Sequence, residues 1–282
     1  MPAILLYAVT SLLYAALGWH FWHTSWRPGA AVRNEGAGGG GVSWARLAIL
    51  VPFALHSYLL YSSLIAEAHL HFGFSQALSV TLWLTVLIYW VESLVYDVKG
   101  MQALVLPLAA ACALLPAFFP GPETPAYTQT FIFRIHLLVA MLAYSLFTIA
   151  ALHATLMTVL ERRLHSRTSS GSLAGPWASL PPLMTLETLL FRILALGFVL
   201  LSLTLVSGFV FSEELFGRAA RINHKTVFGV ISWIIFAALL IGRHGWGWRG
   251  RTALRWTLAG FVALLLAYVG SMFVLQVILG RV

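Results

Sequence analysis

The stretch NHKTVFGVISWIIFAALLIGRHGWGWRGR, residues Asn223–Arg251, decides the fold. It begins with a histidine beside a lysine, runs apolar from Thr226 to Gly242, and ends in Arg243, His244, two tryptophans and more arginines. About 20 apolar residues, each rising about 1.5 Å along a helix, cross the roughly 30 Å hydrocarbon layer of a bilayer. The stretch therefore predicts a membrane-spanning helix with a histidine at one mouth.

The composition extends this interpretation to the whole chain. The 282 residues are 60% hydrophobic and only 9% charged, whereas a soluble domain carries roughly 25% charged residues. The net charge of +8 comes from basic residues at helix ends, where membrane lipid is the expected partner and nucleic acid is not. The single cysteine, Cys112, excludes an internal disulfide, a C-x-x-C thiol catalyst and covalent haem attachment.

Eight apolar segments have spanning length, and we expect residues 1–282 to form one all-α, polytopic transmembrane domain. The N-terminal segment lacks a basic region and a cleavage site, so we interpret it as a retained span. The eight segments are residues 3–22, 45–65, 74–95, 100–119, 131–160, 186–211, 225–243 and 253–278.

Lysine and arginine counts predict the orientation. Eleven lie in the loops after the first, third, fifth and seventh spans, against five on the opposite face. Because cytoplasmic loops carry the excess of basic residues, both termini are expected on the non-cytoplasmic side. The basic loop between the sixth and seventh spans breaks this rule, which would be explained by an anionic ligand.

Two histidines are predicted to lie at the same depth on different helices. His136 is at the outer end of the fifth span and His224 at the outer mouth of the seventh. Two neutral imidazoles can ligate haem iron from opposite faces, and nearby cations can pair with the propionates. The alternative is that each histidine caps a helix end or bonds a loop carbonyl. The cations on the same side are Arg134, Arg218, Arg221 and Lys225.

Other polar residues have weaker signals. His56 lies within the second span. There it could be a deeper ligand, a proton carrier, or a neutral imidazole bonded to a neighbouring helix. His153 is expected at the cytoplasmic side, either pairing with His244 or, as we favour, facing the headgroups. Glu92 is expected to be solvated. Thr185 is expected to cap a helix that has Glu187 in its first turn. No catalytic triad, phosphate loop or paired carboxylates on one helix face are evident, so we expect no enzyme.

The segments Arg134–Ala154 and His224–Gly270 resemble the cytochrome c assembly protein family, the CcsA/ResC/CcmC type of haem-handling membrane protein. The short YpjD-like or HemX-like inner-membrane branch is the most similar. His136, Ala140, Ala143 and Tyr144 match the family's H-x-x-x-A-x-x-A-Y helix, and Trp233 and Arg243 match a tryptophan and an arginine further along. The resemblance implies haem and a multi-pass protein of the bacterial inner membrane.

The chain also departs from the family pattern. The tryptophan-rich WWD loop is missing, because Phe216–Arg221 contains no tryptophan. Asn223, His224, Lys225 and Thr226 fall where the family carries D-P-K-E, and Ile241 falls on a membrane histidine of the cytochrome synthases. The second outer histidine of those synthases is absent as well. An axial role for His224 therefore rests on its depth and spacing rather than on the family motif.

Three functions follow as hypotheses. The first is a haem-binding protein that holds haem b non-covalently near the outer face, with Tyr144 lining the pocket or packing between helices. It would assist cytochrome c biogenesis by passing haem to another maturation or inner-membrane protein. The second is an accessory or regulatory subunit that carries no haem, which the missing loop favours. The third is a transporter, ranked last because no helices are broken in matched positions of two halves.

Overall fold

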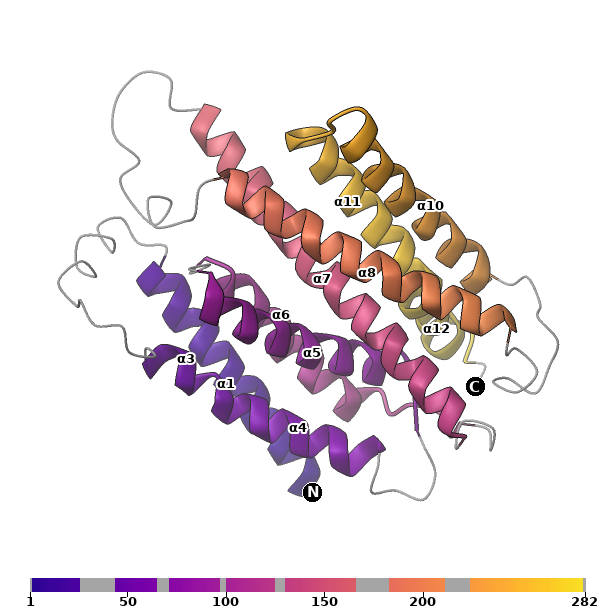
Figure 1. Ribbon diagram of the computed structural model, residues 1–282. Helices are drawn as coiled ribbons and strands as arrows, with labels where there is room; N and C mark the ends of the chain where they lie inside the picture. The colour runs from indigo at the N-terminus through magenta and orange to yellow at the C-terminus, as the bar shows by residue number, and fades with distance from the viewer. Residues whose placement is uncertain are drawn as a thin grey trace.

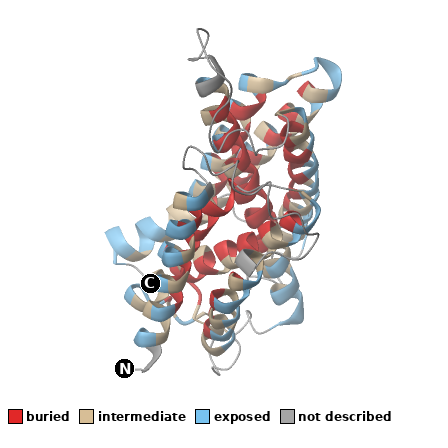
Figure 2. Ribbon diagram, turned by 90° about the vertical axis from the view of Figure 1, so that its left-hand side faces the viewer, coloured by how far each residue is buried: buried red, intermediate tan, exposed pale blue. Residues whose placement is uncertain are grey.

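α7, Phe131–His165, is the central helix of the bundle in the computed structural model, which describes residues 2–25, 44–64, 71–96, 100–124, 130–165, 183–210 and 224–280. It packs against α5, α8 and α11. Residues 143–151 are all buried, and alanines recur among them. Small side chains let neighbouring helices approach closely where the surrounding lipid is as apolar as the protein. Figure 2 shows the buried segments gathered along the middle of the bundle.

The eight predicted spans are present, and the prediction of an all-α polytopic membrane protein is confirmed. Seven helices in the described parts of the chain are long and apolar enough to cross a membrane, and α6 is a shorter apolar helix. The first four spans are α1 (Pro2–Ser25), α3 with α4 (Trp44–Ala48 and Leu50–Leu64), α5 (Phe74–Val95) and α6 (Gln102–Phe118). The others are α7, α8 (Leu183–Val210), α10 (His224–Gly245) and α11 (Gly250–Leu265) with its continuation to Ile278.

The helices form two groups, which Figure 1 shows side by side. In the first, α1 packs on α4 and α6, and α6 packs on α5. In the second, α8 lies between α7 and α10, and α11 packs on both α7 and α10. Contact between α5 and α7 joins the two groups. The N- and C-termini lie at the same end of the bundle, as an even number of spans requires (Figure 1).

The last span changes its helical form before it ends. Two π-helical turns, η3 (Leu266–Gly270) and η4 (Val274–Ile278), flank the short α12 (Ser271–Phe273). In a π-helix each N–H bonds the carbonyl five residues back instead of four, so carbonyls that an α-helix would use become available to other donors. The turn η3 lies against α5 and α10, near the outer end of the bundle.

Candidate functional site

The imidazole of His136 is oriented by a contact with α8. Its Nδ1 lies 2.8 Å from the Ser207 hydroxyl, and that hydroxyl donates its only hydrogen to the Thr204 carbonyl at 3.1 Å. Both contacts are hydrogen bonds when the Ser207 oxygen accepts from His136 Nδ1, which is the geometry of the Nδ1–H tautomer. In that tautomer the lone pair is on Nε2. This is the arrangement of a ligating histidine, whose other ring nitrogen donates to an orienting partner.

The neighbouring residue of α8 has no side chain to cover that ring. A Cβ added at Gly208 would lie 3.6 Å from His136 Cε1, the ring carbon between Nδ1 and Nε2. Glycine therefore adds no side chain at this position beside the half-buried imidazole. Arg134 is exposed and lies two residues before His136 on α7, and residues at that spacing do not share a helix face.

His224 and Lys225 begin α10 at the same end of the bundle. Gly229 faces Leu205 of α8, so the antiparallel helices place His224 near the level of Val210, within about 5 Å in depth of Ser207 and its partner His136. His224 is exposed. The other two predicted cations, Arg218 and Arg221, lie outside the described residues. The structure thus places His136 and His224 at one membrane face, on α7 and α10.

Lys225 turns toward the last span. Its ammonium lies 5.3 Å from the centre of the Tyr268 ring and 3.2 Å from the Met272 sulfur. A cation above an aromatic face is held by the ring's quadrupole. Lys225 is therefore fixed at the outer end of the bundle, and its charge has no carboxylate partner among the ion pairs of the described residues.

Tyr144 packs between helices, which was one of the two roles expected for it; the other was to line a haem pocket. It is buried, and its hydroxyl donates to the Leu264 carbonyl at 2.9 Å. In an α-helix that carbonyl would accept from the N–H of Tyr268, but η3 shifts the backbone pattern here. The Tyr144 side chain thereby ties α7 to the start of the π-helical turn.

His56 lies in the other group of helices. It is fully buried, its Nε2 lies 2.9 Å from the Ser79 hydroxyl of α5, and the Tyr14 ring of α1 meets it edge-on. These contacts are those of a neutral imidazole bonded to a neighbouring helix, the third of the three alternatives. Within the described residues, no group of three or more histidines, cysteines and carboxylates is placed to hold a metal ion.

The sequence-based placement of Glu92 and His153 was wrong. Glu92 is buried rather than solvated, and His153 is buried rather than facing the headgroups. The His153 Nε2 lies 2.8 Å from a Glu92 oxygen, and its Nδ1 bonds the Ile149 carbonyl at 2.9 Å. Each residue lies within an apolar segment and offers the other the partner that a buried ionisable group needs. The presence of two ionisable residues in the inner halves of separate spans was the sequence signal that could have predicted this pair.

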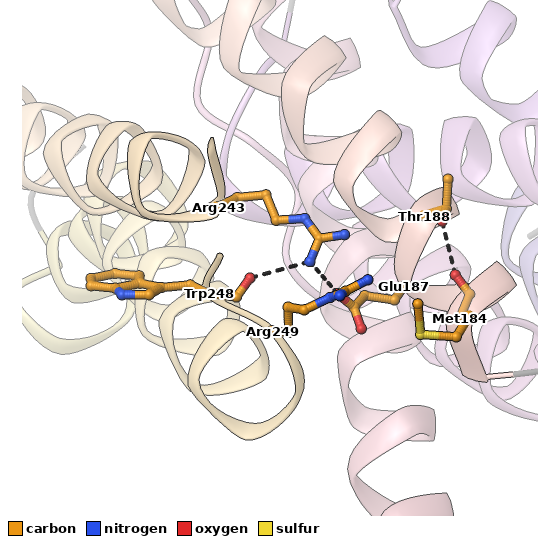
Figure 3. A network of polar contacts seen from close by, with 6 residues as sticks. All are labelled: Met184, Glu187, Thr188, Arg243, Trp248 and Arg249. Atoms are coloured by element: carbon orange, nitrogen blue, oxygen red, sulfur yellow. Dashed lines mark hydrogen bonds and ion pairs between the residues drawn. The ribbon is translucent and has the colours of Figure 1, made fainter. Parts of the chain in front are cut away.

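Glu187 also has a different role from the one predicted (Figure 3). α8 begins at Leu183, so Thr185 lies within its first turn instead of capping it. The Glu187 carboxylate leaves α8 toward α10 and binds Arg243 at 2.5 Å and Arg249 at 3.3 Å. The Arg243 guanidinium also lies 4.6 Å from the centre of the Phe191 ring. The arginine that matches the family pattern therefore joins α8 to α10 at the inner end.

Comparison with known proteins gives a consistent result. The family described as Cytochrome C assembly protein matches residues 44–279. The inner membrane protein YpjD of Escherichia coli is 29% identical over 89% of this chain and 92% of its own length. An uncharacterized 28.8 kDa protein of Azospirillum brasilense is 29% identical over 74% of this chain and 78% of its own length. The cytochrome c biogenesis protein CcsA of Prochlorococcus marinus is 30% identical over 60% of each chain.

These matches and the helices agree on location. Seven helices among the described residues are long and apolar enough to span a membrane, and 89% of the chain aligns with an inner membrane protein. The prediction of a multi-pass protein of the bacterial inner membrane is confirmed.

Proposed function

Because the chain belongs to the cytochrome c assembly protein family, which matches residues 44–279, we propose that it binds haem b non-covalently near the outer membrane face and passes it to a partner. The partner would be another protein of cytochrome c maturation or of the inner membrane. In this role the protein forms and breaks no covalent bond of the substrate, so it acts as a delivery component and not as an enzyme. A relative that is named a cytochrome c biogenesis protein supports the assignment to this process.

The observation that carries the proposal is the contact that orients the His136 ring. Nδ1 lies 2.8 Å from the Ser207 hydroxyl, which also contacts the Thr204 carbonyl. With the serine hydrogen on that carbonyl, Ser207 accepts from Nδ1, and Nε2 has the lone pair that an axial ligand must offer. A histidine that merely capped a helix end would need no such orienting partner. Bound haem would supply an iron with two axial positions and two anionic propionates.

His224 is the residue we propose for the second axial position. It is exposed at the first residue of α10, near the depth of His136. Imidazoles on two separate helices can approach a flat ring from its two faces without a continuous loop between them. This would let the chain hold haem without the tryptophan-rich loop of the family.

The basic residues of this end would hold the propionates. Lys225 is held there by Tyr268 and Met272. Arg134 is exposed and lies two residues before His136 on α7. Arg218 and Arg221 complete the proposed set from the sequence. Cation–propionate pairs at a membrane surface are charge-assisted hydrogen bonds, about twice as strong as neutral ones.

The test is the visible absorption spectrum of the detergent-purified protein, oxidised and reduced, with and without added haem. The variants are His136→Ala, His224→Ala and the double variant. His244→Ala is the matched control, because His244 is also exposed on α10 but lies at its other end and bonds only the Leu240 carbonyl of its own helix. We expect sharp reduced bands in the parent protein and in His244→Ala, and their loss in the double variant.

Two results would contradict the proposal. A parent protein that stays colourless and ignores added haem would favour the accessory-subunit hypothesis, which also predicts stoichiometric co-purification with another membrane protein. Bands that survive unchanged in the double variant would show that other residues ligate the haem.

A further inference from the structure

A cavity at the inner end of the bundle is separate from the proposed haem site. It measures about 330 Å³ and lies between the end of α5 and the first turns of α8. The residues that line it are Tyr96, Met184, Thr185, Thr188, Leu189 and Arg192. It therefore combines one cation, three hydroxyl groups and two apolar side chains. Met184 and Leu189 supply the apolar part.

The cavity lies at the boundary of the hydrocarbon layer. α5 spans 22 residues, or about 33 Å, which matches the roughly 30 Å thickness of that layer. Tyr96 follows the last residue of α5 and so marks the boundary, where tyrosine is enriched. α8 has 28 residues, about 42 Å, so its first turns extend past the hydrocarbon. Arg192 binds Tyr96 and is thereby fixed at the level of the headgroups.

The Thr188 hydroxyl donates to the Met184 carbonyl at 2.9 Å, whereas Arg192 and Tyr96 keep unused donors. One N–H of the Arg192 guanidinium donates to the Tyr96 hydroxyl at 3.2 Å, and an arginine has five such donors. Because the Tyr96 oxygen accepts in this bond, its own hydrogen remains available as a donor. No carboxylate in the described part of the chain pairs with Arg192. The site therefore presents a positive charge and several donors to an acceptor-rich anion.

The neighbouring acid does not neutralise this charge. Glu187 leaves α8 on the side of α10 and is bound by Arg243 and Arg249, whereas Met184 and Thr188 lie on another side of the helix (Figure 3). The two positive charges of Arg243 and Arg249 exceed the single negative charge of the Glu187 carboxylate. Lipid-facing side chains of α8, among them Leu196 and Val199, continue from the cavity into the membrane.

We propose that this cavity binds the phosphate of an anionic phospholipid. Arg192 and the Tyr96 hydroxyl would hold the phosphate oxygens, the threonine hydroxyls would meet the rest of the headgroup, and the acyl chains would lie along α8. Basic pockets between membrane helices at the cytoplasmic side are suited to such headgroups. The positive-inside count predicts that this end of the bundle faces the cytoplasm.

The test compares lipids in nanodiscs or detergent micelles by native mass spectrometry, with the full chain and its Arg192→Gln variant. The probes are phosphatidylglycerol and phosphatidylcholine of equal chain length. Arg255→Gln is the matched control, because Arg255 is exposed on α11 and does not line the cavity. We expect the parent and Arg255→Gln to retain phosphatidylglycerol at least about fivefold better than phosphatidylcholine, and Arg192→Gln to lose this preference.

Two further measurements distinguish a lipid phosphate from a free phosphate ion and exclude the possibility that the Arg192 variant has simply misfolded. Millimolar inorganic phosphate should leave phosphatidylglycerol bound, because a free ion lacks the acyl chains that lie along α8. A Tyr96→Phe variant, which keeps Arg192, should weaken the preference by a smaller factor. Equal retention of both lipids by the parent, equal losses in the two arginine variants, or displacement by inorganic phosphate would each overturn the proposal.

Discussion

Glu92 of α5 and His153 of α7 form a buried pair, with 2.8 Å between a carboxylate oxygen and the ring Nε2. Their side chains are 6% and 0% exposed. The His153 Nδ1 donates to the Ile149 carbonyl of its own helix at 2.9 Å, so Nε2 is the ring nitrogen that faces the carboxylate. The pair joins the two groups of helices at the contact between α5 and α7.

Removing one partner of this pair should destabilise the protein strongly. His153→Leu leaves the Glu92 carboxyl buried without its partner, which typically costs about 3 to 5 kcal/mol. We expect a lower thermal midpoint of the helical circular dichroism signal in detergent. The double variant Glu92→Leu/His153→Leu should recover part of the loss, because no uncompensated polar group remains. Strictly additive losses would contradict the coupling between the two residues.

The helices could be predicted from sequence because length and hydropathy alone define a membrane span. The expected segment 74–95 coincides with α5 (Phe74–Val95), and the other spans differ at their ends by a few residues. The depth of His136 and His224 followed from the same information. A one-dimensional pattern gives the depth of each residue, and therefore which residues lie at the same membrane face.

The lateral partners could not be predicted, because hydropathy does not show which side of a helix faces protein. The sequence predicts a solvated Glu92 and places Glu187 in the first turn of a helix capped by Thr185, yet each carboxylate is buried against a basic residue of another helix. The distinction between ligand and packing residue at Tyr144 depended on a π-helical turn that has no evident sequence signal here. The loop with Arg218 and Arg221 lies outside the described residues, so these two stay predictions.

Tyr144→Phe should destabilise the bundle through one lost hydrogen bond. The change removes the hydroxyl that reaches the Leu264 carbonyl at 2.9 Å, and a buried acceptor left unpaired costs about 1 to 3 kcal/mol. Thermal unfolding in detergent measures the loss. Tyr58→Phe is the control, since Tyr58 is exposed on α4 and the same atom can be removed there at little cost. Equal effects of the two changes would contradict the packing role of Tyr144.

Gly242→Ala should be destabilising where Gly245→Ala is not. A Cβ at Gly242 would overlap the Trp248 ring, which folds back over the end of α10, whereas a Cβ at Gly245 meets nothing within 4 Å. Overpacking of this kind costs about 1 to 3 kcal/mol. Alanine at an open helical position instead favours the helix by up to about 1 kcal/mol. The thermal midpoints of the two variants should therefore move in opposite directions, and a shared direction would contradict this account.

Ser207→Ala should weaken haem binding without touching a proposed ligand. Without the hydroxyl that lies 2.8 Å from His136 Nδ1, the ring loses the contact that orients it. Loss of such an orienting partner typically costs about 10- to 100-fold in affinity for the bound metal. Haem titration, followed by absorbance, measures the change. Ser207→Thr restores the hydroxyl and should restore most of the affinity, while Ser62→Ala removes a hydroxyl that bonds only Leu59 of its own helix and should change nothing. Unaltered affinity in Ser207→Ala, with binding still lost in His136→Ala, would mean that the His136 ring is oriented by the haem itself rather than by α8.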